Sequence, residues 1–262
     1  MPTVYDIIQT LISAVPGAPF SGTVDTLKTG ELSQEVTGIV ITFLATYEVI
    51  QQAAGLGANL IITHEPTFYN HLDQTMLLEG DPVYQAKARL IAENKIAIWR
   101  FHDYWHSYIP DGILTGTLRA LGWQAYSEPG MPEVLNLPPM TLLELSRLFK
   151  EKLGINTLRC IGNPDLVCRR AALLVGAPGW VPQIGTLGRD DIDVLITGEV
   201  SEWETSEYAR DAVRMGLKKG LIVTGHAPSE EHGMAYLAGV LRPQFPGLPV
   251  TFVPAGSPFQ WV

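Results

Sequence analysis

Short apolar runs alternate along this chain with longer segments of helical periodicity. Apolar runs bounded by turn residues predict buried strands, and apolar positions three and four apart predict amphipathic helices. The predicted strands cover residues 38–44, 59–63, 96–101, 169–175, 191–197, 220–225 and 248–253. The predicted helices cover residues 47–57, 81–95, 141–154, 201–216 and 228–241. This alternation predicts an α/β fold with largely parallel sheets covered by helices.

A Pro- and Gly-rich stretch, SEPGMPEVLNLPPM at 127–140, separates the first group of elements from the second. Such composition predicts a linker or a domain edge. The sequence therefore predicts two α/β units. The shorter GAPGW segment at 176–180 has no phosphate-binding spacing and predicts a loop.

Three of the predicted strands run directly into a histidine. The segment LIIT leads into His64 and Glu65, and IAIWRF leads into His102. The third, GLIVTG, leads into His226, with Glu230 four residues later. Because ligands bind outside the carboxyl ends of parallel strands, we expect these side chains to converge at one sheet edge as a metal site.

The ligand chemistry narrows the choice of metal. His106 adds a further donor beside His102, and none of the six histidines lies between residues 107 and 225. Imidazole and carboxylate donors favour zinc, iron, manganese, nickel or cobalt. Five or six ligands are too many for one tetrahedral ion, so the pattern predicts two divalent ions. Cys160 and Cys168 lack metal-ligand spacing and are interpreted as reduced structural cysteines.

Composition excludes several other classes of protein. The 262 residues are 46% hydrophobic and 17% charged, as in a soluble globular protein. A net charge of −9 argues against binding to nucleic acid or to an anionic membrane surface. No apolar stretch is long enough to span a bilayer, and the first twenty residues do not resemble a signal peptide. We therefore expect a cytoplasmic location.

Four segments together resemble one known family. GANLIITHEPTFYNHLD, RFHDYWH with PDGI after it, DIDVLITGEVSEWE and GHAPSEEHGMAYLA occur in the order found in the NIF-three-like dinuclear metal-binding family. Its members are frequently named GTP cyclohydrolase type-two homologues. The resemblance covers almost the whole chain, and it is most specific in the first and last of these segments.

The resemblance assigns ligands at six positions and shows two departures. His64, His102, His226 and Glu230 match the usual metal ligands of the family. Glu65 stands where a second histidine is usual, and His106 stands where an aspartate is usual. The exchange keeps the number and total charge of the ligands, which favours two metals over one. The adjacent Asp103 is an alternative replacement for the aspartate.

The resemblance also implies an architecture and an assembly. It implies two similar α/β domains, one formed by residues 1–127 and 220–262 and the other by the inserted residues 128–219. The metal site would lie in the cleft between them. Family members commonly form toroidal hexamers, so a homo-oligomer is expected.

Two further polar residues are candidates for a supporting role. His71 would orient a ligating imidazole or lie in a solvated turn. Glu199 follows another predicted strand, and would line the cleft or begin the next helix.

The preferred functional hypothesis is a metal-dependent hydrolase that acts on a small molecule. Metals would activate water and polarise the substrate, and Glu65 would be the general base if it is not a ligand. A metal-handling or metal-sensing protein, and an interaction module with structural metals, are the alternatives. Fold and metal together do not select a substrate.

Overall fold

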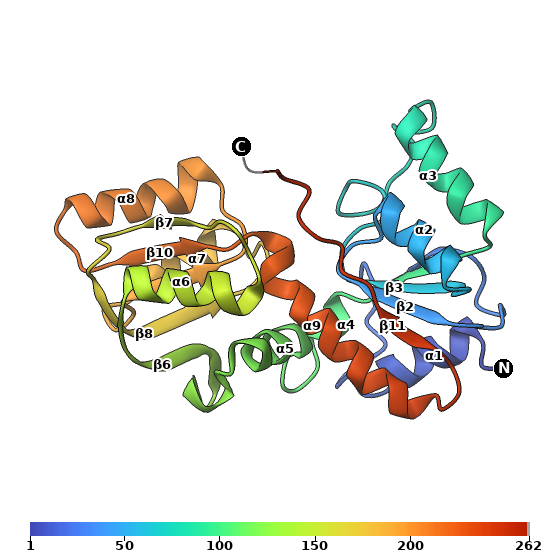
Figure 1. The fold of residues 1–262 in the computed structure, drawn as a ribbon, viewed down its shortest axis with the longest axis horizontal. Coiled ribbons are helices and arrows are strands. Elements are labelled where there is room, and N and C mark those ends of the chain that lie inside the picture. The colour runs from blue at the N-terminus through green and yellow to red at the C-terminus, as the bar shows by residue number, and fades with distance from the viewer. Residues whose placement is uncertain (261–262) are drawn as a thin grey trace. The chain divides into compact units, whose positions relative to one another are not determined.

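The computed structural model describes residues 1–260, which form two compact α/β units (Figure 1). Unit 1 contains Met1–Gly116 and Gly233–Ala255. Unit 2 contains Thr117–His232 and, among the described residues, 256–260. Each unit has one mixed sheet with helices packed on it, so the predicted fold class of two helix-covered α/β domains is confirmed.

Unit 1 is built on a five-stranded sheet. In spatial order its strands are β1 (Leu27–Thr29), β4 (Ala97–Arg100), β3 (Leu60–Thr63), β2 (Ile39–Thr42) and β11 (Val250–Phe252). The last four run parallel, and only the edge strand β1 is antiparallel to its neighbour. Strands β2, β3 and β4 are buried along their whole length, as expected for a parallel sheet covered on both faces.

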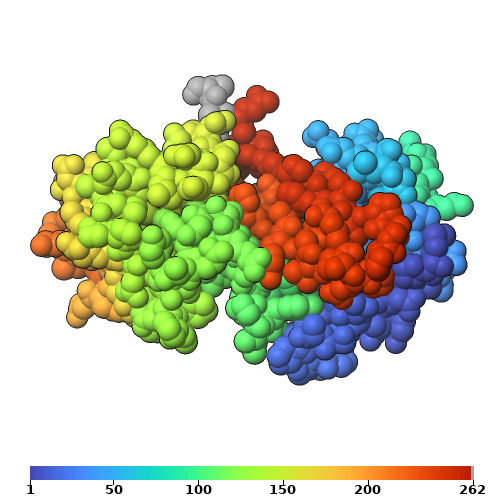
Figure 2. Space-filling model, turned by 60° about the horizontal axis from the view of Figure 1, so that its bottom comes forward, coloured from blue at the N-terminus to red at the C-terminus, as the bar shows by residue number. Residues whose placement is uncertain are grey.

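Helices cover both faces of the unit 1 sheet. The helical elements of this part of the chain are α1 (Val4–Ile12), α2 (Tyr47–Gly55), α3 (Pro82–Glu93), α4 (Asp103–His106), α5 (Gly112–Leu121) and α9 (His226–Leu241). Helices α2 and α3 pack on one face, where Val40, Ile61 and Ile98 of adjacent strands enter a shared core. Helix α1 and the later part of α9 cover the other face, and Figures 1 and 2 both show them side by side.

Unit 2 is built on a six-stranded sheet. In spatial order its strands are β5 (Ser127–Glu128), β6 (Met131–Thr141), β8 (Val167–Leu174), β9 (Val194–Thr197), β10 (Gly220–Val223) and β7 (Arg159–Ile161). The neighbours β8, β9 and β10 are parallel, and the outer strands are antiparallel to them. The helices of this part are α6 (Leu142–Leu153), α7 (Trp180–Leu187) and α8 (Glu207–Arg214), with a π-helix at Glu202–Ser206.

The structure corrects two expectations from the sequence. Residues 127–140 are not a linker, because Met131–Thr141 form the long strand β6. Pro138 and Pro139 lie where the register with β8 breaks, between Asn136 and Met140, so they interrupt no regular pairing there. The strand before His226 does not share a sheet with the other two histidine strands, because β10 pairs with β9 and β7.

The compact units and the predicted domain segments have different bounds. The chain passes from unit 1 to unit 2 after Gly116 and returns to unit 1 after His232. The division into residues 1–127 with 220–262 and an inserted 128–219 stays a prediction. Among residues 1–260, no helix has both the length and the apolar character needed to cross a bilayer.

Candidate metal centre

Two neighbouring parallel strands of unit 1 deliver the first group of donors. Strands β3 and β4 pair in register up to Thr63 and Arg100, so His64 and His102 follow them at the same edge. His106 lies one helical turn beyond His102 on α4 and therefore on the same side. The predicted convergence at the carboxyl ends of parallel strands holds for these three histidines.

The three imidazoles form a compact cluster. One ligand atom from each of His64, His102 and His106 lies within 4.8 Å of the others. The ring centroids of His64 and His102 are 4.5 Å apart, and His106 lies 5.1 and 5.0 Å from them. His64 is fully buried, whereas about a quarter of the His102 and His106 side chains is exposed. The cluster thus contains one fully buried imidazole, that of His64, and two that are partly exposed to solvent.

An oxygen acceptor meets the Nδ1 atom of each of these rings. His64 Nδ1 lies 3.2 Å from the carbonyl oxygen of Phe101. His102 Nδ1 lies 2.9 Å from Asp103 Oδ1, and His106 Nδ1 lies 2.8 Å from Asp111 Oδ2. Carbonyl and carboxylate oxygens only accept, so each Nδ1 donates, and a ring whose single N–H is at Nδ1 carries its lone pair on Nε2. This is the arrangement by which proteins orient metal-binding histidines.

The protonation of His102 suits a ligand. Burial, together with the neighbouring His64 imidazole, lowers the pKa of His102 to about 4, against the opposing effect of Asp103. His102 is therefore neutral at neutral pH, which is the state that binds a metal. Asp103 accepts hydrogen bonds from His102, from Thr23 Oγ1 and from the Val24 N–H, so it supports His102.

Glu65 lies at the edge of this cluster and is held by an arginine. Its Oε2 atom is 3.3 Å from Arg100 Nη2, and its Oε1 atom is 3.8 Å from His102 Nε2. The Glu65 side chain is 14% exposed, and that of Arg100 is fully buried. Glu65, which stands where a histidine is usual in the family, is thus held between Arg100 and His102.

A buried carboxylate that sequence reasoning missed organises the backbone of the second motif. Asp25 Oδ1 accepts from the main-chain N–H groups of His102 and Asp103, and Oδ2 accepts from that of Tyr104. Asp25 is 6% exposed, and burial raises its pKa against the lowering effect of these three bonds. It anchors the first turn of α4, but no spacing in the sequence connects residue 25 to residue 102.

A second group of donors lies in unit 2, where β10 leads into α9. His226 Nε2 is 3.2 Å from Glu230 Oε2, one helical turn along. His226 Nδ1 is 3.1 Å from Glu199 Oε2, so Glu199 orients this ring as Asp103 and Asp111 orient theirs. Glu230 is 3% exposed, which makes it a deeply buried carboxylate.

Two glycines make room for this buried carboxylate. Gly176 has φ of 66°, and a Cβ on it would overlap the Glu230 carboxylate, with Cδ only 2.8 Å away. The Gly176 N–H donates to Ser229 Oγ at 2.9 Å, and Ser229 Oγ donates to the His226 carbonyl oxygen at 2.7 Å. A Cβ on Gly198 would overlap Ser229 Oγ. Residues 176–179 of the GAPGW segment form a loop, as predicted, whereas Trp180 already begins α7. The first glycine of this loop shapes the surroundings of Glu230.

The remaining candidate, His71, has an exposed side chain. Its carbonyl oxygen accepts from Arg100 Nη1 at 2.6 Å, so its described contact is through the main chain. Cys160 is exposed and Cys168 is buried, and both are free thiols. The donors described here are therefore nitrogen and oxygen atoms, which fit the divalent metals that prefer imidazole and carboxylate.

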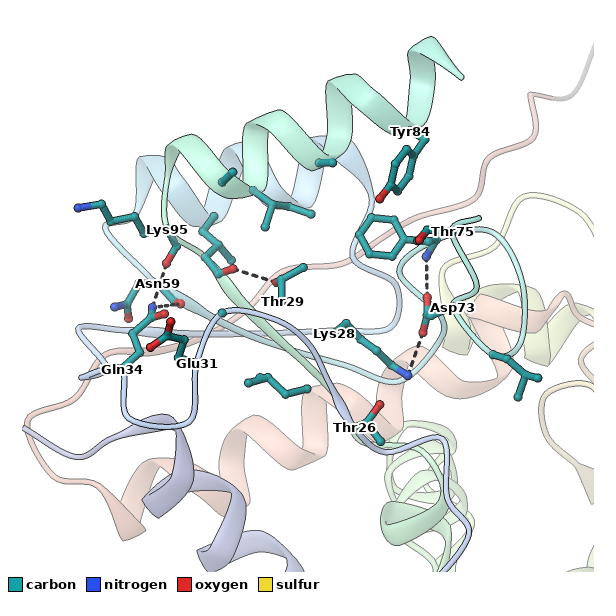
Figure 3. Close-up of a pocket in the computed structure, with 18 residues that line it drawn as sticks. Thr26, Lys28, Thr29, Glu31, Gln34, Asn59, Asp73, Thr75, Tyr84 and Lys95 are labelled. Atoms are coloured by element: carbon teal, nitrogen blue, oxygen red, sulfur yellow. Dashed lines mark hydrogen bonds and ion pairs between the residues drawn. The ribbon is translucent and has the colours of Figure 1, made fainter. Parts of the chain in front are cut away.

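A surface depression of unit 1 lies away from these donors (Figure 3). It has a volume of about 960 Å³ and runs between α3 and the edge strand β1. Lys28 and Asp73 on its wall form a buried ion pair at 3.2 Å, and Gln34 donates to the Lys95 carbonyl oxygen. None of the predicted ligands lines it. Ligation requires converging donors rather than volume, so the chemistry is assigned to the histidine cluster.

Comparison with known proteins gives concordant matches. A family model described as Duf34/NIF3 (NGG1p interacting factor 3) matches residues 3–258. The GTP cyclohydrolase 1 type 2 homolog of Clostridium perfringens is 28% identical over 214 residues, which are 78% of this chain and 77% of the relative. The Escherichia coli protein of the same name is 26% identical over 228 residues, which are 87% and 88% of the two chains.

Solved structures match over the whole chain. The crystal structure of a Bacillus cereus protein related to NIF3 aligns with a TM-score of 0.77 and 18% identity, covering 100% of this chain and 99% of that one. Staphylococcus aureus protein SA1388 aligns with a TM-score of 0.76 and 18% identity, covering 99% of each chain. At this level of identity the likeness shows a common fold.

Proposed function

The chain belongs to the Duf34/NIF3 family, and on that premise we propose that it binds two divalent metal ions and hydrolyses a small molecule. The proposed ligands are three residues of the first cluster with the adjacent Glu65, and two residues of unit 2. They are His64, Glu65, His102, His106, His226 and Glu230. The observation that carries the proposal is the cluster of three histidines, each with its Nδ1 on an oxygen acceptor.

The supporting residues have a defined task in this proposal. Phe101, Asp103, Asp111 and Glu199 hold the rings so that Nε2 presents the lone pair. When bound, divalent ions of this class acidify water and polarise a carbonyl, imine or phosphoryl group. Glu65 is proposed as a ligand. The alternative role for Glu65 is that of the general base.

The substrate class rests on the names of relatives. Several related proteins carry the name GTP cyclohydrolase 1 type 2 homolog, so GTP is the first candidate to assay. The net charge of −9 is unfavourable for a triphosphate in the absence of metal. We also propose a cytoplasmic protein that assembles as a hexamer, on the family resemblance. Light scattering of the purified protein measures the assembly directly.

Metal content of purified protein tests the proposed ligands. We expect the wild type to hold close to two equivalents by elemental analysis, and His64→Ala and His226→Ala each to lose half or more. His71→Ala is the matched control, because the His71 side chain is exposed and the bond from Arg100 goes to the His71 carbonyl oxygen, which alanine keeps. Wild-type protein that holds no metal after growth in supplemented medium would contradict the proposal.

Turnover separates the hydrolase from the two alternatives. Metal-loaded protein should hydrolyse GTP or another small molecule in a broad screen, and both His64→Ala and chelation should abolish the activity. A metal-handling protein would bind and release ions without turnover. An interaction module would keep its ions under mild chelation and lose its fold when they are removed.

A further inference from the structure

Arg100 is the largest charged side chain in the interior of unit 1. It ends β4, two residues before His102, and it is fully buried. Its Nε donates to the His64 carbonyl oxygen at 3.1 Å and its Nη1 to the His71 carbonyl oxygen at 2.6 Å. Its Nη2 donates to Glu65 Oε2 at 3.3 Å. One guanidinium therefore contacts both ends of the segment from residue 64 to residue 71.

The charge of Arg100 requires a partner. Removing a guanidinium from water is costly unless it is hydrogen-bonded and paired with an anion. Main-chain carbonyls satisfy its hydrogen bonds at two positions, and Glu65 supplies the negative charge at the third. A histidine at position 65, which is usual in the family, would leave this buried cation without its anion. Arg100 and the unusual Glu65 therefore form a matched pair.

This pairing gives the two oxygens of Glu65 different surroundings. Oε2 faces the guanidinium, and Oε1 faces His102 Nε2 at 3.8 Å. His102 Nδ1 is on Asp103, so its Nε2 is the nitrogen that presents a lone pair. Oε1 and this nitrogen are two potential donor atoms 3.8 Å apart, a separation at which one ion can bind both.

We propose that Arg100 is a positioning residue that holds Glu65 through Oε2 and so makes Glu65 a one-oxygen metal ligand through Oε1. The inference rests on the proposed metal-binding function and refines it. A carboxylate with one oxygen on Arg100 and the other on a metal ion has no oxygen left to accept a proton from water. Glu65 is then a ligand rather than the general base. Arg100 also offsets the negative charge of Glu65. The donors of unit 1 together with Arg100 therefore carry about the same net charge as a set of neutral imidazoles would.

A double-mutant cycle on metal affinity tests the proposal. The proteins are the full-length wild type, Glu65→Gln, Arg100→Lys and the double variant, each titrated with Zn²⁺ against a chromophoric chelator. We expect Arg100→Lys to weaken binding about 10- to 100-fold, as loss of a group that orients a ligand does. In the Glu65→Gln background the same change should have little further effect, because an amide that turns its oxygen to Arg100 presents an NH2 group in place of the ligand oxygen.

A purely structural role for Arg100 predicts a different result. If Arg100 only ties the 64–71 segment together, its loss will weaken Zn²⁺ binding equally in both backgrounds, and that result would overturn the proposal. Unchanged affinity in a folded Arg100→Lys protein would overturn it as well. The absorption spectrum of Co²⁺-loaded protein reports on the coordination of the ion. We expect Arg100→Lys to change this spectrum when residue 65 is Glu and to leave it unchanged in the Glu65→Gln background.

Failure of this inference is distinguishable from failure of the proposed function. Wild-type protein that binds no metal rejects the function, whereas metal-binding wild type with an additive cycle rejects only the role of Arg100. If Arg100→Lys does not fold, a crystal structure of metal-loaded wild type decides. Glu65 with Oε1 on the ion and Oε2 on Arg100 supports the proposal, and both oxygens on the ion, or neither, contradicts it.

Discussion

Gly176 lies directly against Glu230: a Cβ at this glycine would come within 2.8 Å of the carboxylate Cδ and closer still to Oε1. The glycine also has φ of 66°, a conformation that costs other residues energy. The turn after β8 and the first turn of α9, more than fifty residues apart in sequence, are thereby fitted to one another within unit 2. The position of a proposed metal ligand depends on the absence of a side chain at residue 176.

Replacing Gly176 by Ala should displace Glu230. We expect a loss of about 1–3 kcal/mol in the free energy of unfolding, from backbone strain and overlap, and weaker metal binding. Gly179→Ala is the matched control, since it has φ of 84° in the same loop but nothing within 4 Å of its Cβ. Urea unfolding and Zn²⁺ titration measure both effects. Equal metal affinities in the two variants would show that the contact with Glu230 is unimportant.

Asp111→Asn should weaken metal binding with little loss of stability. Asp111 Oδ1 accepts from the Leu114 N–H at 2.9 Å at the start of α5, and Oδ2 accepts from His106 Nδ1. Asparagine keeps the helix contact but turns an amide donor toward the ring, so we expect about 10- to 100-fold weaker Zn²⁺ binding. The Asp81 carboxylate, at the N-cap of α3, accepts from the main-chain N–H groups of Val83 and Tyr84 rather than from a histidine, so the control variant Asp81→Asn should bind Zn²⁺ normally. Identical losses in both variants would contradict this account.

Asp25→Asn should destabilise unit 1. The buried carboxylate accepts three main-chain N–H bonds on its two oxygens, and an amide would turn a donor toward at least one of them. The loss of unfolding free energy should be about 1–3 kcal/mol. Asp6→Asn, in the exposed capping box of α1, is the control and should lose less. Near-equal urea midpoints for the two variants would argue against a structural role of Asp25.

Lys87 should make stability rise with alkaline pH. Its Nζ donates to the Thr67 carbonyl oxygen at 2.6 Å, and the residue is 2% exposed. Burial lowers the pKa of Lys87 from 10.5 to about 8, partly opposed by the Asp73 charge. Between these values the unfolded chain holds more protons than the folded one, so the free energy of unfolding increases with pH.

Chemical denaturation across this alkaline range measures the contribution of Lys87. One proton gives a slope of at most about 1.4 kcal/mol per pH unit. Lys87→Met should flatten the rise, whereas Lys218→Met, at an exposed position of unit 2, should leave it unchanged. A rise that persists in full in Lys87→Met would assign it to another group.

Local patterns predicted the central elements because buried parallel strands are uniformly apolar over short runs. Strands β2, β3, β4, β9 and β10 lie where such runs predict them. The edge strand β1 and the proline-containing β6 lack that signal, since an edge or irregularly paired strand is only partly buried. A local pattern also does not determine which strands pair, and the expectation that the strand before His226 shares a sheet edge with the other two histidine strands is therefore wrong.

The sequence by itself determined the α/β class, the family resemblance and the histidines that follow strands, because apolar runs and motif spacing are properties of neighbouring residues. Only the tertiary structure decided which other residues hold the proposed ligands and their main chain in position. Asp25, Arg100 and Gly176 are remote from the residues they support, and their roles arise from burial and close contact. Hydrogen bonds and steric fit depend on distances in space, and a single sequence does not record them.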